Sequence, residues 1–136
     1  MVKTYNDYLR KLLSKIDCIL ALETSADYLG LSNGGYRKYA QIYVTKKYNI
    51  KDTKQIIIPS FSDIEYIEMR GLKVTTINQT IVDMLSNDNC DEQILIESLA
   101  NYLDEYKNFD GLKIPNELEN HFEKLKYQAE IFYTED

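Results

Sequence analysis

The sequence predicts a single α+β domain over residues 1–136, in which helices flank a small mixed or antiparallel sheet and the C-terminal third is helical. Three observations lead to this fold class. The 136 residues suffice for one domain with a core but not for two ordinary domains. Short segments with strand-like alternation fill the middle of the chain. Apolar residues at helical spacing dominate both ends.

The N-terminal segment predicts two helices. The first spans Tyr5–Ile16, where apolar residues recur every three or four positions. Thr4 with Asp7 three residues later is close to a capping box, which predicts the start of this helix. A second, short helix is predicted over Thr24–Leu31, capped at its start and stopped by Gly30.

The middle of the chain predicts a loop followed by four strands. The loop is Ser32–Gly35, where turn-forming residues follow one another. Arg70-Gly71 fits a tight turn between the last two strands. The strands, recognised by alternation or by β-branched residues, are Ala40–Thr45, Lys54–Pro59, Ile64–Met69 and Leu72–Thr75.

The last third predicts three helices. Thr76 and Gln79 form a capping box before a helix whose apolar face runs to Leu85. Asp91 opens the next helix, which the Phe109–Gly111 segment ends. Pro115 starts the last one. The apolar positions of these three helices include Ile77, Ile81, Met84, Ile94, Leu99, Leu103, Leu118, Phe122, Leu125 and Ala129.

The charge is divided unevenly between the two parts of the chain. The net charge is −6, but residues 1–55 carry +5 and residues 56–136 carry −11. A basic N-terminal part and an acidic C-terminal part favour two surfaces with different partners. The alternative is that the acidic residues belong to solvated faces of the C-terminal helices.

The sequence contains no set of residues that indicates catalysis or a cofactor. No GxSxG, GxxxxGK[ST] or HExxH pattern occurs, and no nucleophile is paired with a base. His121, the one histidine, is more typical of a helix surface than of a general base. Cys18 and Cys90 are far apart, so neither a zinc site nor a disulfide is expected. We therefore expect a protein that is not an enzyme and has no catalytic, metal-binding or cofactor-binding residues.

The sequence also predicts where the protein works. No segment approaches the roughly 20 apolar residues that a membrane span needs. The first residues lack the apolar region of a signal peptide. We expect a cytoplasmic protein without a membrane partner.

Two segments of the chain resemble a known family. Ile19–Leu31, which contains Leu29 and Gly30, is similar to the ALxxLGL helix of the AbiEi-type antitoxins of bacterial abortive-infection systems. Gly71–Leu85 resembles that family's signature GlxVTxxxRTlvDll, with Thr75, Gln79, Thr80 and Asp83 at motif positions. The resemblance extends from about Ile19 to Leu103, which is most of the chain.

The resemblance implies an antitoxin of a toxin–antitoxin system. Members of the family neutralise a companion nucleotidyltransferase-like toxin through this domain, and many also carry an N-terminal winged helix that represses their operon. Here one predicted helix precedes Ile19, so sequence-specific DNA binding is not expected. Gln79-Thr80 stands where the family has Arg-Thr, so the role of that arginine is lost or replaced. A phage or mobile-element protein that counters a host defence would also fit.

Tyrosine-rich basic residues form the first candidate partner-binding set. The chain has 12 tyrosines, and several of them alternate with lysine or arginine before residue 49. Such a pattern suits a protein partner, because tyrosine provides a large contact area at low entropic cost. It also suits nucleic acid, or a strand with solubilising lysines. The candidate residues are Tyr36, Arg37, Lys38, Tyr39, Lys46 and Lys47.

The acidic C-terminal segment forms the second candidate set and supports an alternative function. A row of carboxylates can imitate a phosphate backbone and occupy the nucleic-acid channel of a basic enzyme. The chain would then be an anti-CRISPR-like inhibitor of a nucleic-acid-handling defence enzyme. Neighbouring tyrosines, where exposed, would anchor the complex. The candidate residues are Tyr102, Tyr106, Glu119, Glu123, Tyr127 and Glu130.

Overall fold

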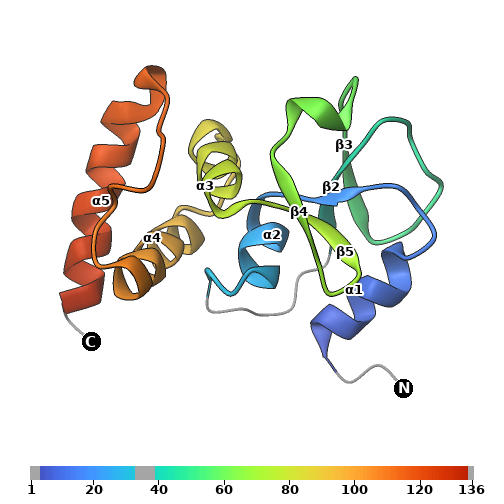
Figure 1. Cartoon of the computed structure of the whole chain (residues 1–136), viewed down its shortest axis with the longest axis horizontal. Helices are drawn as coiled ribbons and strands as arrows, with labels where there is room; N and C mark the ends of the chain where they lie inside the picture. Colours follow the sequence, from blue (N-terminus) through green and yellow to red (C-terminus); the bar gives the residue numbers. More distant parts are fainter. Residues whose placement is uncertain (1–3, 33–38, 135–136) are drawn as a thin grey trace.

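The computed structural model describes residues 4–32 and 39–134, and it confirms the α+β fold class. A five-stranded mixed sheet occupies the centre of the chain (Figure 1). Its strands are β1 (Ile19–Leu20), β2 (Ala40–Val44), β3 (Thr53–Ile57), β4 (Tyr66–Met69) and β5 (Leu72–Thr75).

Residues 4–32 and 39–134 also form five α-helices and two short 3₁₀ helices. One helix precedes β1, one follows it, and three follow β5, so the C-terminal part is helical as predicted. The α-helices are α1 (Tyr5–Leu13), α2 (Leu22–Tyr28), α3 (Ile77–Ser86), α4 (Glu92–Tyr106) and α5 (Glu119–Thr134), and the 3₁₀ helices are η1 (Phe61–Asp63) and η2 (Asn116–Leu118).

The strand order is β3-β2-β1-β5-β4, which makes the sheet mixed. β1 pairs in parallel with β5 and antiparallel with β2, while β2–β3 is parallel and β4–β5 is antiparallel. β1 is not among the four strands that the sequence predicted, and it is the central strand of the sheet. Ile19 and Leu20 are both completely buried, because two strands and two layers of side chains enclose them.

Two hydrophobic clusters lie on the two faces of the sheet. One packs Leu9 and Leu13 of α1 against Ile42 and Val74. The other is larger and joins the sheet to α2, α3, α4 and α5 through a continuous set of buried side chains. Figure 1 shows α4 and α5 at the end of the molecule opposite to β3. The larger cluster contains Ile19, Tyr43, Ile81, Met84, Leu95, Leu99, Phe122, Leu125 and Ala129, among others.

The predicted helix starts are correct wherever a side chain caps the first turn. The Thr4 hydroxyl accepts a hydrogen bond from the Asp7 amide at 3.1 Å, and Thr76 does the same for Gln79 at 3.2 Å. The Asp91 carboxylate accepts from the amide of Gln93 at 2.9 Å. These bonds satisfy amides that the helix itself leaves without partners.

Four predicted helix boundaries are wrong. The first helix ends at Leu13 and not at Ile16. The last α-helix begins at Glu119, after the 3₁₀ helix η2, and not at Pro115.

The other two boundaries are those of the second helix. It ends at Tyr28 and not at Leu31. It begins at Leu22, two residues before the predicted cap at Thr24. The Thr24 hydroxyl instead accepts from the Gln41 amide of β2 at 3.0 Å, so a contact between distant segments replaces the local cap.

Gly30 ends α2 as predicted. Its φ of +80° is the left-handed conformation that favours glycine. The amide of Leu31 donates to the Ala26 carbonyl at 2.8 Å, and that of Gly30 to the Asp27 carbonyl at 3.1 Å. This pair of bonds is a Schellman motif, which turns the chain away from the helix.

Candidate functional site

Two of the residues that resemble the antitoxin signature, Thr75 and Thr80, form a buried hydroxyl network with Ser25 of the other family-like segment. The Thr75 and Thr80 hydroxyls are 2.6 Å apart, and the Ser25 hydroxyl is 2.5 Å from that of Thr75. Thr80 also donates to the Thr76 carbonyl at 2.7 Å. Ser25, Thr75 and Thr80 are all fully buried. The network joins α2, β5 and α3, so these residues hold the fold together and cannot touch a partner directly.

Gln79, at the position of the family's arginine, joins α3 to the segment before β4. Its side-chain amide donates to the Asp83 carboxylate at 2.8 Å, and its side-chain oxygen accepts from the Glu65 amide at 3.1 Å. The predicted return bond to the Thr76 amide is absent from the described residues, because that amide donates to the Glu65 carbonyl. The capping box is therefore only half formed.

Asp83 lies between α3 and the sheet. Its carboxylate accepts a hydrogen bond from the Tyr43 hydroxyl at 2.7 Å in addition to the one from Gln79. Burial raises the pKa of Asp83, although both hydrogen bonds act in the opposite direction. The pKa of Tyr43 is also raised, first by burial and then by its bond to Asp83. The Asp83–Tyr43 pair is therefore a largely buried structural contact between α3 and β2.

Glu23 is a buried acid that sequence patterns did not single out. Its carboxylate accepts from the Gln41 side-chain amide at 3.0 Å and from the Asp91 amide at 3.4 Å. These contacts connect α2 to the sheet and to the start of α4. No local pattern could have identified them, because the partners are 18 and 68 positions away.

The predicted tyrosine-rich basic set is not gathered into one patch by the described residues. Tyr36, Arg37 and Lys38 lie outside the residues that the structure describes. Tyr39 precedes β2 and Lys46 follows it, so a whole strand separates them. Lys46 lies over the ring of Tyr48 at 5.4 Å.

A different basic region forms at this end of the molecule. The Tyr8 hydroxyl donates to the Asp52 carboxylate at 2.9 Å and so attaches α1 to the β2–β3 connection. The Asp17 amide donates to the Tyr48 hydroxyl at 3.4 Å nearby. These bonds join two segments that both carry exposed lysines, namely Lys11, Lys15, Lys46, Lys47, Lys51 and Lys54.

The predicted acidic set divides into an exposed and a buried part. Glu119, Glu123, Tyr127 and Glu130 are all exposed, and their spacing of three or four residues places them on one face of α5. Glu123 pairs with Lys126 at 3.9 Å, which reduces the charge of this face. We name these four residues the α5 acidic face.

The expectation of an exposed anchor at Tyr102 is wrong. Its side chain is only 6% exposed, because the ring packs between two other rings. The ring centroid of Tyr102 lies 5.9 Å from that of Phe109, on which it stacks, and 4.5 Å from that of Tyr106. Tyr106, one turn later on α4, is 49% exposed. It remains a candidate for partner contact.

A groove lies between the ends of α2 and α4 and strand β4. It consists of two adjoining hollows of 440 and 540 Å³, and Leu29, Ile77, Tyr102 and Tyr106 line both. We name it the α4–β4 groove. The first hollow is further lined by Gly30, Leu31, Ser32, Asn101, Asp104 and Glu105, and the second by Ile67, Met69, Thr76, Asn78, Gly111 and Leu112.

The groove is lined both by residues of a family-like segment and by a residue of the predicted partner-binding set. Leu29 and Gly30 come from the segment that resembles the antitoxin helix, and Tyr106 from the predicted partner-binding set. Ile67 was not predicted as a surface residue. Its exposure follows from the position of β4 at the edge of the sheet, which depends on the strand order.

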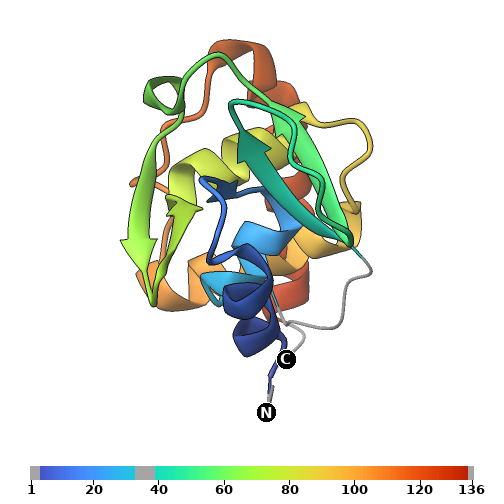
Figure 2. The ribbon, with the colours of Figure 1, turned by 90° about the vertical axis from the view of Figure 1, so that its right-hand side faces the viewer.

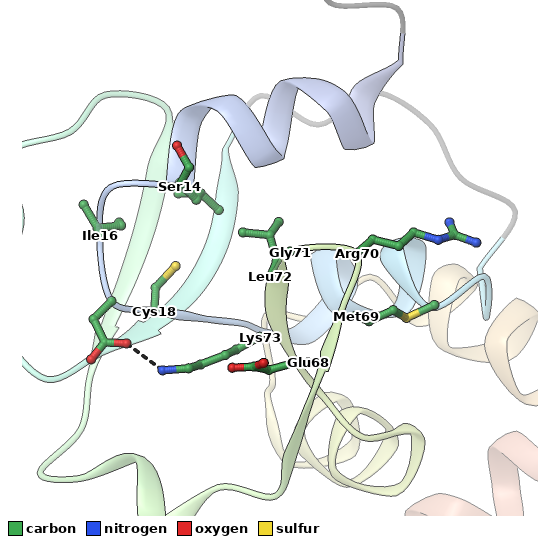
Figure 3. A pocket seen from close by; sticks show the side chains of 11 residues that line it. Ser14, Ile16, Cys18, Glu68, Met69, Arg70, Gly71, Leu72 and Lys73 are labelled. Atoms are coloured by element: carbon green, nitrogen blue, oxygen red, sulfur yellow. Dashed lines mark hydrogen bonds and ion pairs between the residues drawn. The ribbon is translucent and has the colours of Figure 1, made fainter.

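A separate hollow of 330 Å³, outside the α4–β4 groove, lies between the end of α1 and the β4–β5 hairpin (Figure 3). Lys73 forms an ion pair with Asp17 at 2.8 Å and also lies over the rings of Phe61 and Tyr66. Burial raises the pKa of the Cys18 thiol to about 12, so this thiol stays protonated and weakly reactive at neutral pH. Charges that neutralise each other and a protonated thiol make this hollow a weak candidate for ligand chemistry.

Residues 4–32 and 39–134 contain neither a cluster of metal ligands nor a helix that could span a membrane. No group of three or more His, Cys, Asp or Glu side chains is arranged to hold a metal ion. No helix in these ranges has both the length and the apolar character to cross a membrane.

The comparisons with known proteins returned no relative. No protein-family model matches the chain, and no curated protein or solved structure matches it significantly. Evidence for the function of this chain therefore comes from the geometry of its own residues and from the two family-like segments.

Proposed function

We propose that this chain is a non-catalytic, antitoxin-like protein that neutralises a nucleotidyltransferase-like toxin, or another defence factor, by direct contact. The observation that carries the proposal is the α4–β4 groove. Leu29 and Gly30 of the family-like helix line it together with Tyr106, a predicted partner contact. One of its two hollows is lined mainly by apolar surface, and an exposed apolar hollow is typical of an interaction site.

The structural role of most family-like residues is consistent with this proposal. Thr75 and Thr80 are fully buried, and Asp83 and Gln79 bond to each other and to neighbouring segments. Residues of this kind preserve a binding domain, because losing one partner leaves a buried polar group unsatisfied. Contact with a partner is then left to the exposed residues around the groove.

Co-expression tests this function. The chain is expressed with a nucleotidyltransferase-like toxin encoded beside its gene, and growth and complex formation are measured. We expect restored growth and a complex that copurifies. Thr45→Val serves as a surface control, because Thr45 is exposed and does not line the groove. A toxin that stays lethal, without a complex or a modification of the toxin, would contradict the proposal.

A second candidate function is inhibition of a nucleic-acid-handling defence enzyme. The observation that favours it is the α5 acidic face, which presents Glu119, Glu123 and Glu130 to solvent beside the 67% exposed Tyr127. A basic channel that binds phosphates would also attract these carboxylates.

Competition against guide or target nucleic acid tests this second candidate. Reversal of Glu119, Glu123 and Glu130 to lysine should slow association with a candidate nuclease, since rim charges mainly affect the association rate. Tyr127→Ala should shorten the lifetime of the complex instead. A triple variant that inhibits as well as the original chain would rule out the decoy mechanism.

A further inference from the structure

The apolar part of the α4–β4 groove is open to solvent on both sides. Ile67 of β4 is 45% exposed, and Tyr106 of α4 is 49% exposed. Leu29, Met69 and Leu112 line the hollow with them. Single exposed apolar side chains are ordinary, but a continuous set around a hollow marks an interaction site.

The groove runs beside a free sheet edge. β4 is the last strand in the sheet order, and none of the described strands pairs with its outer side. Figure 2 shows it as the outermost strand on its side of the molecule, opposite to β3. An edge strand can pair with an extended segment of another chain, whose alternate side chains then point to one face. Ile67 and Met69 are the β4 side chains that line the groove, so they mark that face.

The other end of the groove is acidic. Asp104 and Glu105 are the charged residues among those that line the two hollows, and both are exposed. No lysine or arginine lines either hollow among the described residues. A cationic side chain placed here would meet two carboxylates without a competing cation.

The groove also holds an unsatisfied polar atom. The Ser32 hydroxyl is buried, with the residue only 8% exposed, and it has no hydrogen-bond partner among the described residues. A buried hydroxyl without a partner costs free energy, which a polar group on a bound molecule would recover. Ser32 lines the same hollow as Asp104 and Glu105.

We infer that the α4–β4 groove binds an extended segment of the partner protein that combines apolar residues with lysine or arginine. The segment pairs with the outer edge of β4, its apolar side chains contact Ile67 and Tyr106, and its cation contacts Asp104 and Glu105. This inference rests on the proposed function in one respect only, which is that the occupant is a protein.

The opposite sheet edge provides a matched control. Ile57 of β3 is 59% exposed, so it is an edge isoleucine with even more exposure than Ile67. Lys54 is the charged residue of β3, so this strand carries no carboxylate. A basic peptide should therefore discriminate between two similar edges by their charge.

The test is a titration of the full chain with synthetic peptides, followed by amide NMR. The probe is acetyl-Lys-Val-Ile-Val-Lys-amide, and the comparison peptide carries glutamate in place of both lysines. We expect the basic peptide to shift signals around Ile67, Tyr106 and Asp104 with a dissociation constant of about 1 mM or lower. The acidic peptide should bind at least about tenfold more weakly.

Three variants complete the experiment. Ile67→Arg should weaken the basic peptide about tenfold, while Ile57→Arg should leave it unchanged. Asp104→Lys combined with Glu105→Lys should reverse the preference toward the acidic peptide. Because these residues are exposed, all variants should keep the folded NMR spectrum.

Several results would overturn the inference. They are the absence of shifts at the groove at millimolar peptide, equal binding of both peptides, and shifts that follow Ile57. A dimer that Ile67→Arg converts to a monomer would show a second copy of the chain as the occupant. If the titrations fail while the chain neutralises the toxin, peptide binding at the groove is rejected and the proposed function stands. If the peptides bind while the toxin stays lethal, only the proposed function is rejected.

Discussion

The sheet with α2 and α3 differs from the C-terminal helices in where it places its polar groups. Thr75, Thr80 and Ser25 face inward and bond to one another, whereas Glu119 and Glu130 face solvent on α5. Buried polar groups fix a fold because each needs a partner, while exposed charges are free to meet another molecule. The recognisable segments of this sequence therefore hold the domain together, and under the proposed function the surface around them contacts the partner.

The largest expected effect tests whether the two regions fold together. Leu125 of α5 is fully buried in the same cluster as Ile19 and Tyr43 of the sheet. Leu125→Ala should lower the free energy of unfolding by about 2–5 kcal/mol, because it removes buried methyl groups and leaves a cavity. Urea titration followed by NMR should show β2 and α5 unfolding in one transition. Loss of α5 before the sheet would mean that the regions are independent.

The next effect tests the structural role of the buried network. Thr80→Val removes the hydroxyl that contacts Thr75 and the Thr76 carbonyl. The remaining buried groups lose a partner, so the free energy of unfolding should fall by about 1–3 kcal/mol. The same change at the exposed Thr45 should alter it by less than about 0.5 kcal/mol. Equal effects in urea denaturation would remove the distinction between the buried motif and the surface.

A smaller effect concerns the pH dependence of stability. The folded state binds a proton at Asp83 more tightly than the unfolded state, because burial raises the pKa of this carboxyl above its ordinary 3.8. Asp83 therefore makes the free energy of unfolding fall as the pH rises from 3.8 through the raised value. Asp83→Asn should remove this fall, as measured by urea denaturation across the acidic range. An unchanged slope would show that other groups cause it.

Helix starts could be predicted from the sequence because their determinants are local. Thr4, Thr76 and Asp91 each bond an amide two or three residues away. The start of α2 could not be predicted in this way. Leu22 has a φ of +53°, which non-glycine residues rarely adopt, and Thr24 bonds a distant strand.

The candidate site could be predicted only in part, because exposure depends on long-range order. Tyr106 and Tyr127 are exposed as the hypothesis required, while Tyr102 is buried against Phe109 across the turn after α4. Ile67 shares the alternating pattern of an interior strand, and only the strand order places it at an edge. β1, with two residues, is defined by its pairing with β2 and β5 and not by its own sequence.

The measurement that tests the central claim most directly is toxin neutralisation by Ile67→Arg and Ile57→Arg in parallel. Both replace an exposed edge isoleucine with the same cation, so both chains should fold and melt at similar temperatures. We predict that Ile57→Arg protects cells as well as the original chain and that Ile67→Arg loses protection and the complex, because its cation blocks the groove. Equal protection by the two folded variants would contradict the account.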